Sequence, residues 1–282
     1  IPQALLPHLK WLADPDYTHV YYVDLKPKVF DARIDTDGNG IPDKWKTLLL
    51  LGLNFGGKAI TATGDFDYDS GTADTTRTFS SSYTLLDITD PRNPELLWER
   101  SYDDLGLTTS FPAVIKVGAG VEEKWFAVFG SGPSNYDGTA NGLNGHVYVV
   151  DLTTGEPFQS SSGIDWLFAT AETNAFMNSP VSVDVGLNYN VDAVYFGEAY
   201  YDSSKTVPWR GKLYKMVIPC VDSGGDFSDD SDNYSNNPLA TGINQAWQLV
   251  PLLDATRPIT SSVSLSVDTF DNVWVFVGSG RY

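Results

Sequence analysis

The side chains best suited to chemistry lie in one short acidic loop. This loop runs from Asp35 to Asp43, and oxygen donors stand at its first, third, fifth, seventh and ninth positions. Calcium prefers about six to eight oxygen ligands from a loop that wraps around it, and glycine supplies the positive φ that such a turn needs. The sequence therefore predicts a calcium site. Its ligands are Asp35, Asp37, Asn39, Ile41 (through its carbonyl) and Asp43.

This loop differs from a complete EF-hand. Its twelfth position is Lys46, where an EF-hand carries a bidentate glutamate, and strand-like stretches rather than helices flank it. The alternative interpretation is a solvated Asp/Gly turn. Three aspartates within nine residues repel one another unless a cation lies between them, which favours calcium.

A second stretch, Asp184–Asp192, repeats the pattern in a weaker form. Gly186 occupies its third position, where the first loop has a carboxylate. The sequence therefore predicts a weaker, degenerate calcium loop. Its ligands are Asp184, Asn188, Asn190 and Asp192.

Other kinds of chemistry find little support in the sequence. Cys220 is the single cysteine, which excludes an intrachain disulfide, and the three histidines are too scattered for a zinc site. No Gly-x-Ser-x-Gly motif occurs, and no spacing marks a catalytic pair of carboxylates. We therefore expect a protein that is not an enzyme.

The charge of the chain limits its partners. The formal net charge is −18, from 18 basic and 36 acidic residues, and such a surface repels nucleic acid. No apolar run reaches the roughly 18 residues that a membrane-spanning helix needs. We expect no nucleic-acid partner and no membrane-spanning segment.

An internal repeat indicates how the loops are positioned. Four segments share one layout: an apolar strand, a polar turn, a second apolar strand and an exit glycine. The exit glycines are Gly52, Gly130, Gly197 and Gly278. Further strand patterns follow three of these hairpins, as in the four-stranded blades of a β-propeller. A β-sandwich array is the structural rival, but it does not explain the shared layout.

The sequence thus predicts an all-β fold, a partial β-propeller of about four antiparallel four-stranded blades with long loop insertions. Residues 1–28 are expected to be an N-terminal lead-in segment, and residues 29–282 to be blades of a larger propeller. Both ends of the chain look cut, since it begins with Ile1 and stops directly after a strand-like run. An incomplete propeller leaves unpaired strand edges, so we expect contact with the rest of its own propeller or with another chain.

The order of several motifs resembles one known family, the type IV pilus tip-associated adhesins called PilY or PilC, in their C-terminal β-propeller domain. The stretches that carry the resemblance are Lys46–Leu53 with Leu85–Pro91, Phe129–Gly132 with Gly145–Gly155, Asp184–Gly197 with Gly211–Lys215, and Val277–Tyr282. The resemblance extends from about Val29 to Tyr282. The position that often carries calcium in the family is here the degenerate loop, whereas the intact loop lies earlier in the chain.

The resemblance implies a calcium-binding adhesin or pilus-biogenesis module outside the cytoplasm, at the cell surface or pilus tip. Its partners would be a pilin or minor pilins, or a receptor on a host or abiotic surface. The alternative is a propeller like that of the quinoprotein (PQQ-dependent) dehydrogenases, because Asp151–Glu156 is similar to their blade motif. No Trp recurs a few residues after the Thr-Gly turn, however. Sugar stacking is a further interpretation, although packing explains its candidates more simply; these are Trp166, Tyr200, Tyr201 and Trp209.

Overall fold

The computed structural model consists almost entirely of antiparallel sheets of two to five strands, with one short helix. It describes residues 1–64, 75–118, 123–138, 142–158, 167–187, 189–218, 220–221, 227–228 and 247–280. Part of the degenerate loop, Asn188, lies outside these residues, as do Trp166 and most of the Asp222–Gly242 insertion. Within the described residues no helix is long and apolar enough to cross a membrane.

Sheets I and II are the first two repeats. Sheet I joins its strands in the order β1-β2-β5-β6, and sheet II in the order β7-β8-β9-β10, so each is a four-stranded antiparallel meander. The strands of sheet I are β1 (Lys28–Ile34), β2 (Lys44–Gly52), β5 (Tyr83–Asp87) and β6 (Glu95–Arg100). Those of sheet II are β7 (Ala113–Val117), β8 (Lys124–Gly130), β9 (Asn144–Asp151) and β10 (Leu167–Thr173).

Sheets III and IV are the last two repeats. Sheet III has five strands, because two short strands pair with different parts of the same long strand. Its strands are β11 (Ala175–Met177), β12 (Val181–Val183), β13 (Ala193–Tyr201), β14 (Trp209–Val217) and β17 (Gln248–Ala255). Sheet IV is the hairpin of β18 (Ser264–Val267) and β19 (Val273–Phe276). The expectation of four strands in every repeat is therefore wrong for sheet III and, among the described residues, for sheet IV.

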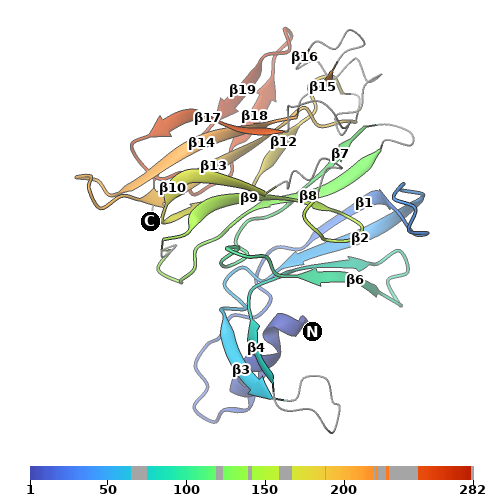
Figure 1. The fold of residues 1–282 in the computed structure, drawn as a ribbon, viewed down its shortest axis with the longest axis vertical. Coiled ribbons are helices and arrows are strands. Elements are labelled where there is room, and N and C mark those ends of the chain that lie inside the picture. The colour runs from blue at the N-terminus through green and yellow to red at the C-terminus, as the bar shows by residue number, and fades with distance from the viewer. Residues whose placement is uncertain are drawn as a thin grey trace.

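Three smaller elements lie outside these sheets. A 3-10 helix, η1 (Gln3–Ala13), lies against a hairpin of β3 (Ile60–Gly64) and β4 (Thr75–Phe79), and Figure 1 shows this hairpin projecting from sheet I next to the N-terminal end. The Gly/Asp/Ser-rich stretch Gly64–Ser82 is expected from the sequence to be a loop, but part of it forms strand β4. The reason is that β-branched threonines pair across the hairpin. A short pair joins β15 (Cys220–Val221) to β16 (Phe227–Ser228).

The sheets pack face to face in chain order, as the ribbon in Figure 1 shows. Side chains alternate between the two faces of a strand. Phe126 and Val128 of β8 therefore pack toward sheet III, whereas Ala127 and Phe129 pack toward sheet I. A strand buried on both faces must be apolar throughout, and this explains the uninterrupted run Phe126–Phe129.

Candidate metal-binding loops

The turns between the first and second strands of successive sheets lie next to one another. The loop Asp35–Asp43 joins β1 to β2, and the loop Asp184–Asp192 joins β12 to β13. The β7–β8 hairpin lies between them and hydrogen-bonds to both. Because the sheets pack in the same orientation, equivalent turns share one edge of the stack. The two loops singled out in the sequence therefore lie at the same edge.

The loop Asp35–Asp43 is held by its own side chains. The carboxylate of Asp35 accepts hydrogen bonds from the backbone N–H groups of Gly38 at 2.7 Å and Gly40 at 2.6 Å. Asp37 accepts from the N–H of Asn39 at 3.1 Å, and Asn39 in turn accepts from that of Ile41 at 2.8 Å. Side chains at alternate positions thus fold inward over the turn, a common arrangement for short Asx-rich loops.

Positive φ angles at two glycines make this turn possible. Gly38 has φ 78° and Gly40 has φ 83°, in the left-handed region that glycine adopts without steric cost. Partial burial raises the pKa of the Asp35 carboxyl, but hydrogen bonds from Gly40, Gly38 and Asp37 outweigh it and leave this pKa below its usual range. Asp35 is therefore charged at neutral pH, as a carboxylate ligand of a cation must be.

Asp43 closes the loop through Thr36. Its carboxylate accepts from the Thr36 N–H at 2.8 Å and from the Thr36 hydroxyl at 2.9 Å, and these bonds lower its pKa. Lys46, at the position of the missing EF-hand glutamate, pairs instead with Asp87 of β5 at 2.7 Å. The loop therefore ends as part of a sheet rather than as the start of a helix.

The loop fits calcium in donor type and in backbone conformation. Its five predicted ligands all provide oxygen, the ligand that this hard cation prefers. Among the residues that the structure describes, however, no group of three or more His, Cys, Asp or Glu is arranged to hold a metal. The carboxylate of Asp43 is turned to Thr36 instead. Calcium binding therefore stays a prediction.

The loop Asp184–Asp192 has the same backbone design as the first loop. Its second residue, Val185, donates its N–H to Asp192 at 2.6 Å, as Thr36 does to Asp43. Its sixth residue, Tyr189, donates its N–H to Asp184 at 2.7 Å, as Gly40 does to Asp35. The sequence did not indicate how closely the two loops agree, because Leu187 and Tyr189 stand where the first loop has glycines. Both residues nevertheless have a positive φ, of 54° and 68°.

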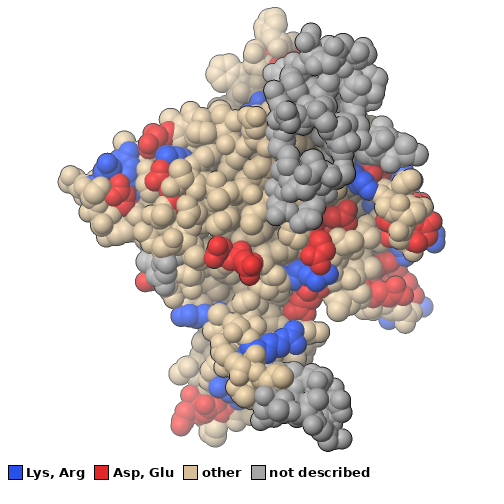
Figure 2. Space-filling view, in the orientation of Figure 1, with Lys and Arg blue, Asp and Glu red and all other residues tan. Residues whose placement is uncertain are grey.

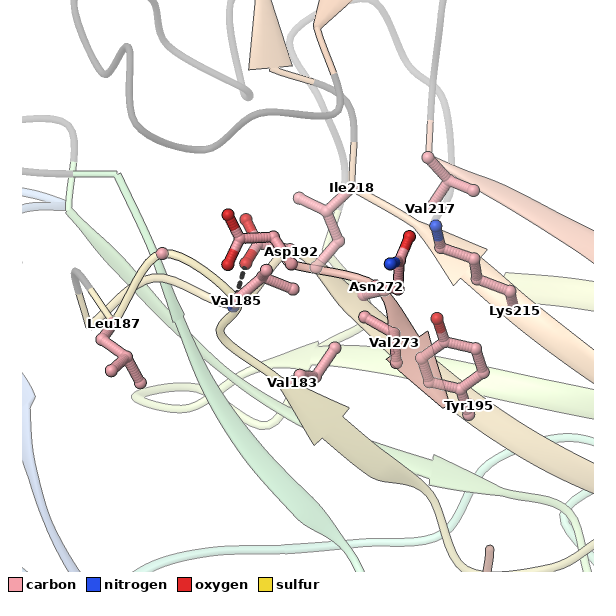
Figure 3. Close-up of a pocket in the computed structure, with 13 residues that line it drawn as sticks. Val183, Val185, Leu187, Asp192, Tyr195, Lys215, Val217, Ile218, Asn272 and Val273 are labelled. Carbon is pink, nitrogen blue, oxygen red and sulfur yellow. Dashed lines mark hydrogen bonds between the residues drawn. The ribbon is translucent and has the colours of Figure 1, made fainter. Parts of the chain in front are cut away.

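A pocket of about 650 Å³ lies between this loop and the β18–β19 turn. Figure 3 shows Asp192 at one side of it, with its carboxylate turned to the backbone of Val185, and Asn272 and Val273 at the other. Asn190, predicted as a ligand, is buried, and its side-chain oxygen accepts from the ammonium of Lys116 at 2.7 Å. In this structure Asn190 therefore binds the neighbouring hairpin.

The β7–β8 hairpin, itself predicted from the sequence, connects the two loops, and this connection was not predicted. The ammonium of Lys124 donates to the carbonyl of Gly40, and Arg33 of β1 pairs with Glu123 at 3.3 Å. On the other side, the N–H of Val191 donates to the carbonyl of Lys116 at 3.1 Å. Each of these contacts joins residues far apart in sequence, so no local pattern could have indicated them.

Packing places the described aromatic residues that were considered for sugar stacking. Tyr200 is buried, and Trp209 contacts Tyr201 edge to face with ring centroids 5.3 Å apart. Among the described residues on the face seen in Figure 2, Lys and Arg are scattered among uncharged residues and next to acidic ones.

Comparisons with known proteins identify the relatives of the chain. No family model matches it. A protein of Xylella fastidiosa described as a type IV pilus biogenesis factor PilY1 homolog is 25% identical over 296 residues. The type IV pilus biogenesis factor PilY1 of Pseudomonas aeruginosa is 27% identical over 292 residues. Both alignments cover 100% of this chain, which spans only 16% and 21% of these relatives.

The fold has a relative among solved structures. The crystal structure of the Pseudomonas aeruginosa PilY1 C-terminal domain matches with a TM-score of 0.57 at 22% identity. The match covers 92% of this chain and 45% of that one. The resemblance found in the motifs is confirmed: the chain is homologous over its full length to the PilY1 type IV pilus biogenesis factors and shares the fold of their C-terminal domain.

Proposed function

We propose that this chain is a calcium-binding, non-enzymatic module of a type IV pilus biogenesis factor or pilus-tip adhesin, exposed at the cell surface. The observation that carries the proposal is the alignment of the whole chain with PilY1 factors of two organisms. The same alignments favour a pilus role over the dehydrogenase alternative. Sheets I to IV then represent successive blades of a propeller, which the remainder of the parent protein or another chain would complete.

Calcium is assigned to the loop Asp35–Asp43. The shared turn geometry of this loop and Asp184–Asp192 supports the assignment. Leu187 and Tyr189 adopt the left-handed φ that glycines adopt in the first loop, and the local sequence alone does not explain this. Asp35, Asp37, Asn39, the Ile41 carbonyl and Asp43 would hold the ion. A cation there would compensate three carboxylates and rigidify the edge of sheet I, where a pilin or a surface receptor could dock.

Calorimetric titration with calcium tests the assignment. One saturable site should appear in the 282-residue chain and be lost in Asp35→Ala and Asp37→Ala. The control is Asp16→Ala, which removes the same charge from an exposed position in the lead-in segment. Binding that persists in both loop variants would place the ion at Asp184–Asp192, and no heat at millimolar calcium would refute metal binding by this chain.

A further inference from the structure

An open groove of about 550 Å³ lies between the two loops. Trp45 of sheet I, Trp125 of sheet II and Tyr189 of the loop before β13 contribute aromatic rings to its lining, which also contains two valines. We call it the aromatic groove; its lining residues are Trp45, Val114, Lys116, Glu123, Trp125, Asp184, Tyr189 and Val191. Trp45 and Trp125 are the second residues of β2 and β8. Their rings meet edge to face, with ring centroids 5.8 Å apart.

Two of the three aromatic side chains of this groove are largely exposed, whereas Trp125 is half-buried. Trp45 is 62% exposed and Tyr189 is 84% exposed. Tyr189 also has a left-handed φ of 68°, which is unfavourable for a residue with a bulky side chain. Such exposed aromatic residues are enriched where a partner binds.

The ring faces of the groove lack the cations that cover other rings of this protein. Elsewhere Lys10 lies over Trp11, Lys58 over Tyr136 and Lys212 over Tyr200, at 4.5 to 5.8 Å from the ring centroids. In the part of the chain that the structure describes, no Lys or Arg is placed in this way over a ring of the aromatic groove. These faces are thus available to a cation from outside.

The charged residues of the groove nearly balance one another, so the attraction of a cation rests on the rings and on the charge of the whole chain. Glu123 and Asp184 contribute two carboxylates to the lining, but Glu123 already pairs with Arg33 at 3.3 Å. Lys116 contributes one ammonium, which donates to the neutral oxygens of Gly118 at 2.9 Å and Asn190 at 2.7 Å. The chain as a whole carries a net charge of −18, which attracts cationic partners over longer distances.

We propose that the aromatic groove binds a lysine or arginine side chain of a partner polypeptide. The alkyl stem would lie on Val114 and Val191, the cationic group would stack on Trp45, Trp125 or Tyr189, and Asp184 would compensate its charge. A neutral sugar fits less well, because the described lining residues include no Ser, Thr, Asn or Gln and a neutral ligand gains nothing from the net charge of −18. The proposal names a partner chemistry for the surface role above and does not depend on bound calcium.

The test is titration of the 282-residue chain with tetra-arginine amide, monitored by tryptophan fluorescence and calorimetry in EDTA. Saturable binding should weaken at least about tenfold in Trp45→Ala and in Tyr189→Ala, and should fall as salt rises. Both side chains are exposed, so neither change removes core packing. The control is Trp274→Ala, since Trp274 is also exposed, at 57%, and stands second in β19 outside the groove.

Three results would overturn the proposal. Equal binding of tetra-arginine to the wild type and to both groove variants would mean general attraction to an acidic surface. Equal binding of an uncharged peptide of the same length would remove the need for a cation. Salt-independent binding of a neutral oligosaccharide, lost in Trp45→Ala, would identify a sugar site instead. Repetition in calcium separates this result from that of the metal assignment, since each can fail alone.

Discussion

The ammonium of Lys124 donates a hydrogen bond to the carbonyl of Gly40, so a cation of sheet II reaches the acidic loop of sheet I. This contact places a positive charge beside Asp35–Asp43, the loop to which we assign calcium. The same hairpin carries Lys116, which binds Asn190 of the second loop. One hairpin therefore connects both loops, and its lysines affect the charge at each.

Lys124 is expected to weaken calcium binding by the first loop. Lys124→Met should raise the calcium affinity about two- to fivefold, because removal of one partly exposed charge at this range is worth up to about 1 kcal/mol. Calorimetric titration at low salt measures the change. Lys205→Met, at an exposed turn between β13 and β14, should leave the affinity unchanged. A lower affinity in Lys124→Met would show that Lys124 holds Gly40 in place for the ion.

Leu187, in its present backbone conformation, is expected to lower the free energy of unfolding. It has φ 54° and is 81% exposed, so its side chain gains little from packing. Leu187→Gly should raise the free energy of unfolding by up to about 1 kcal/mol, because a left-handed residue with a Cβ costs about 1–2 kcal/mol. Urea unfolding measures this difference. Leu96→Gly, at an exposed position of β6, should lower it by about 0.5–1 kcal/mol.

The exit glycines are expected to differ in importance. A Cβ on Gly130 would lie 2.3 Å from the Cβ of Met177, whereas on Gly278 its nearest neighbour would be the Ser261 hydroxyl at 3.9 Å. Gly130→Ala should therefore destabilise the chain by about 1–3 kcal/mol through overpacking between sheets II and III. Gly278→Ala should change the free energy of unfolding by less than about 0.5 kcal/mol. Equal effects in thermal unfolding would contradict this packing explanation.

Glu198 is expected to make stability depend on pH. This residue of β13 is fully buried and accepts hydrogen bonds from the hydroxyls of Thr170 and Tyr214. Burial raises its pKa from 4.5 to about 7, against the opposing effect of these bonds. The folded state therefore keeps a proton that the unfolded state loses above about pH 4.5. The stability from this group is present below that pH and is lost as the pH rises toward 7, by about 3 kcal/mol.

Measurement of unfolding free energies at pH 5 and pH 8 tests this expectation. The loss on going from pH 5 to pH 8 should be about 2.5 kcal/mol smaller in Glu198→Gln than in the wild type, since the amide cannot ionise. Glu95→Gln, at an exposed position of β6, should keep the wild-type difference. An unchanged pH difference in Glu198→Gln would show that other groups cause it.

Much of the fold could be predicted from the sequence because hairpins are local. The repeat pattern predicts strands over residues 29–34, 44–52, 112–117 and 124–130, and β1, β2, β7 and β8 begin and end within one residue of these stretches. Apolar patterns and Gly/Asp turns act over only a few positions. The ligand pattern of Asp35–Asp43 is local in the same way. Strand β4 was missed, because its sequence Thr75–Phe79 is exposed and polar except at its last residue.

Only the tertiary structure decided which surfaces meet. The contacts of Lys124 with Gly40 and of Lys116 with Asn190 join residues 84 and 74 positions apart. The aromatic groove likewise needs Trp45 of sheet I, Trp125 of sheet II and Tyr189 of the loop before β13. The sequence by itself determined the hairpins and the oxygen donors of each loop, because these depend on neighbouring residues. The face-to-face packing of the sheets decided the groove and the links between loops, because it brings distant turns to one edge.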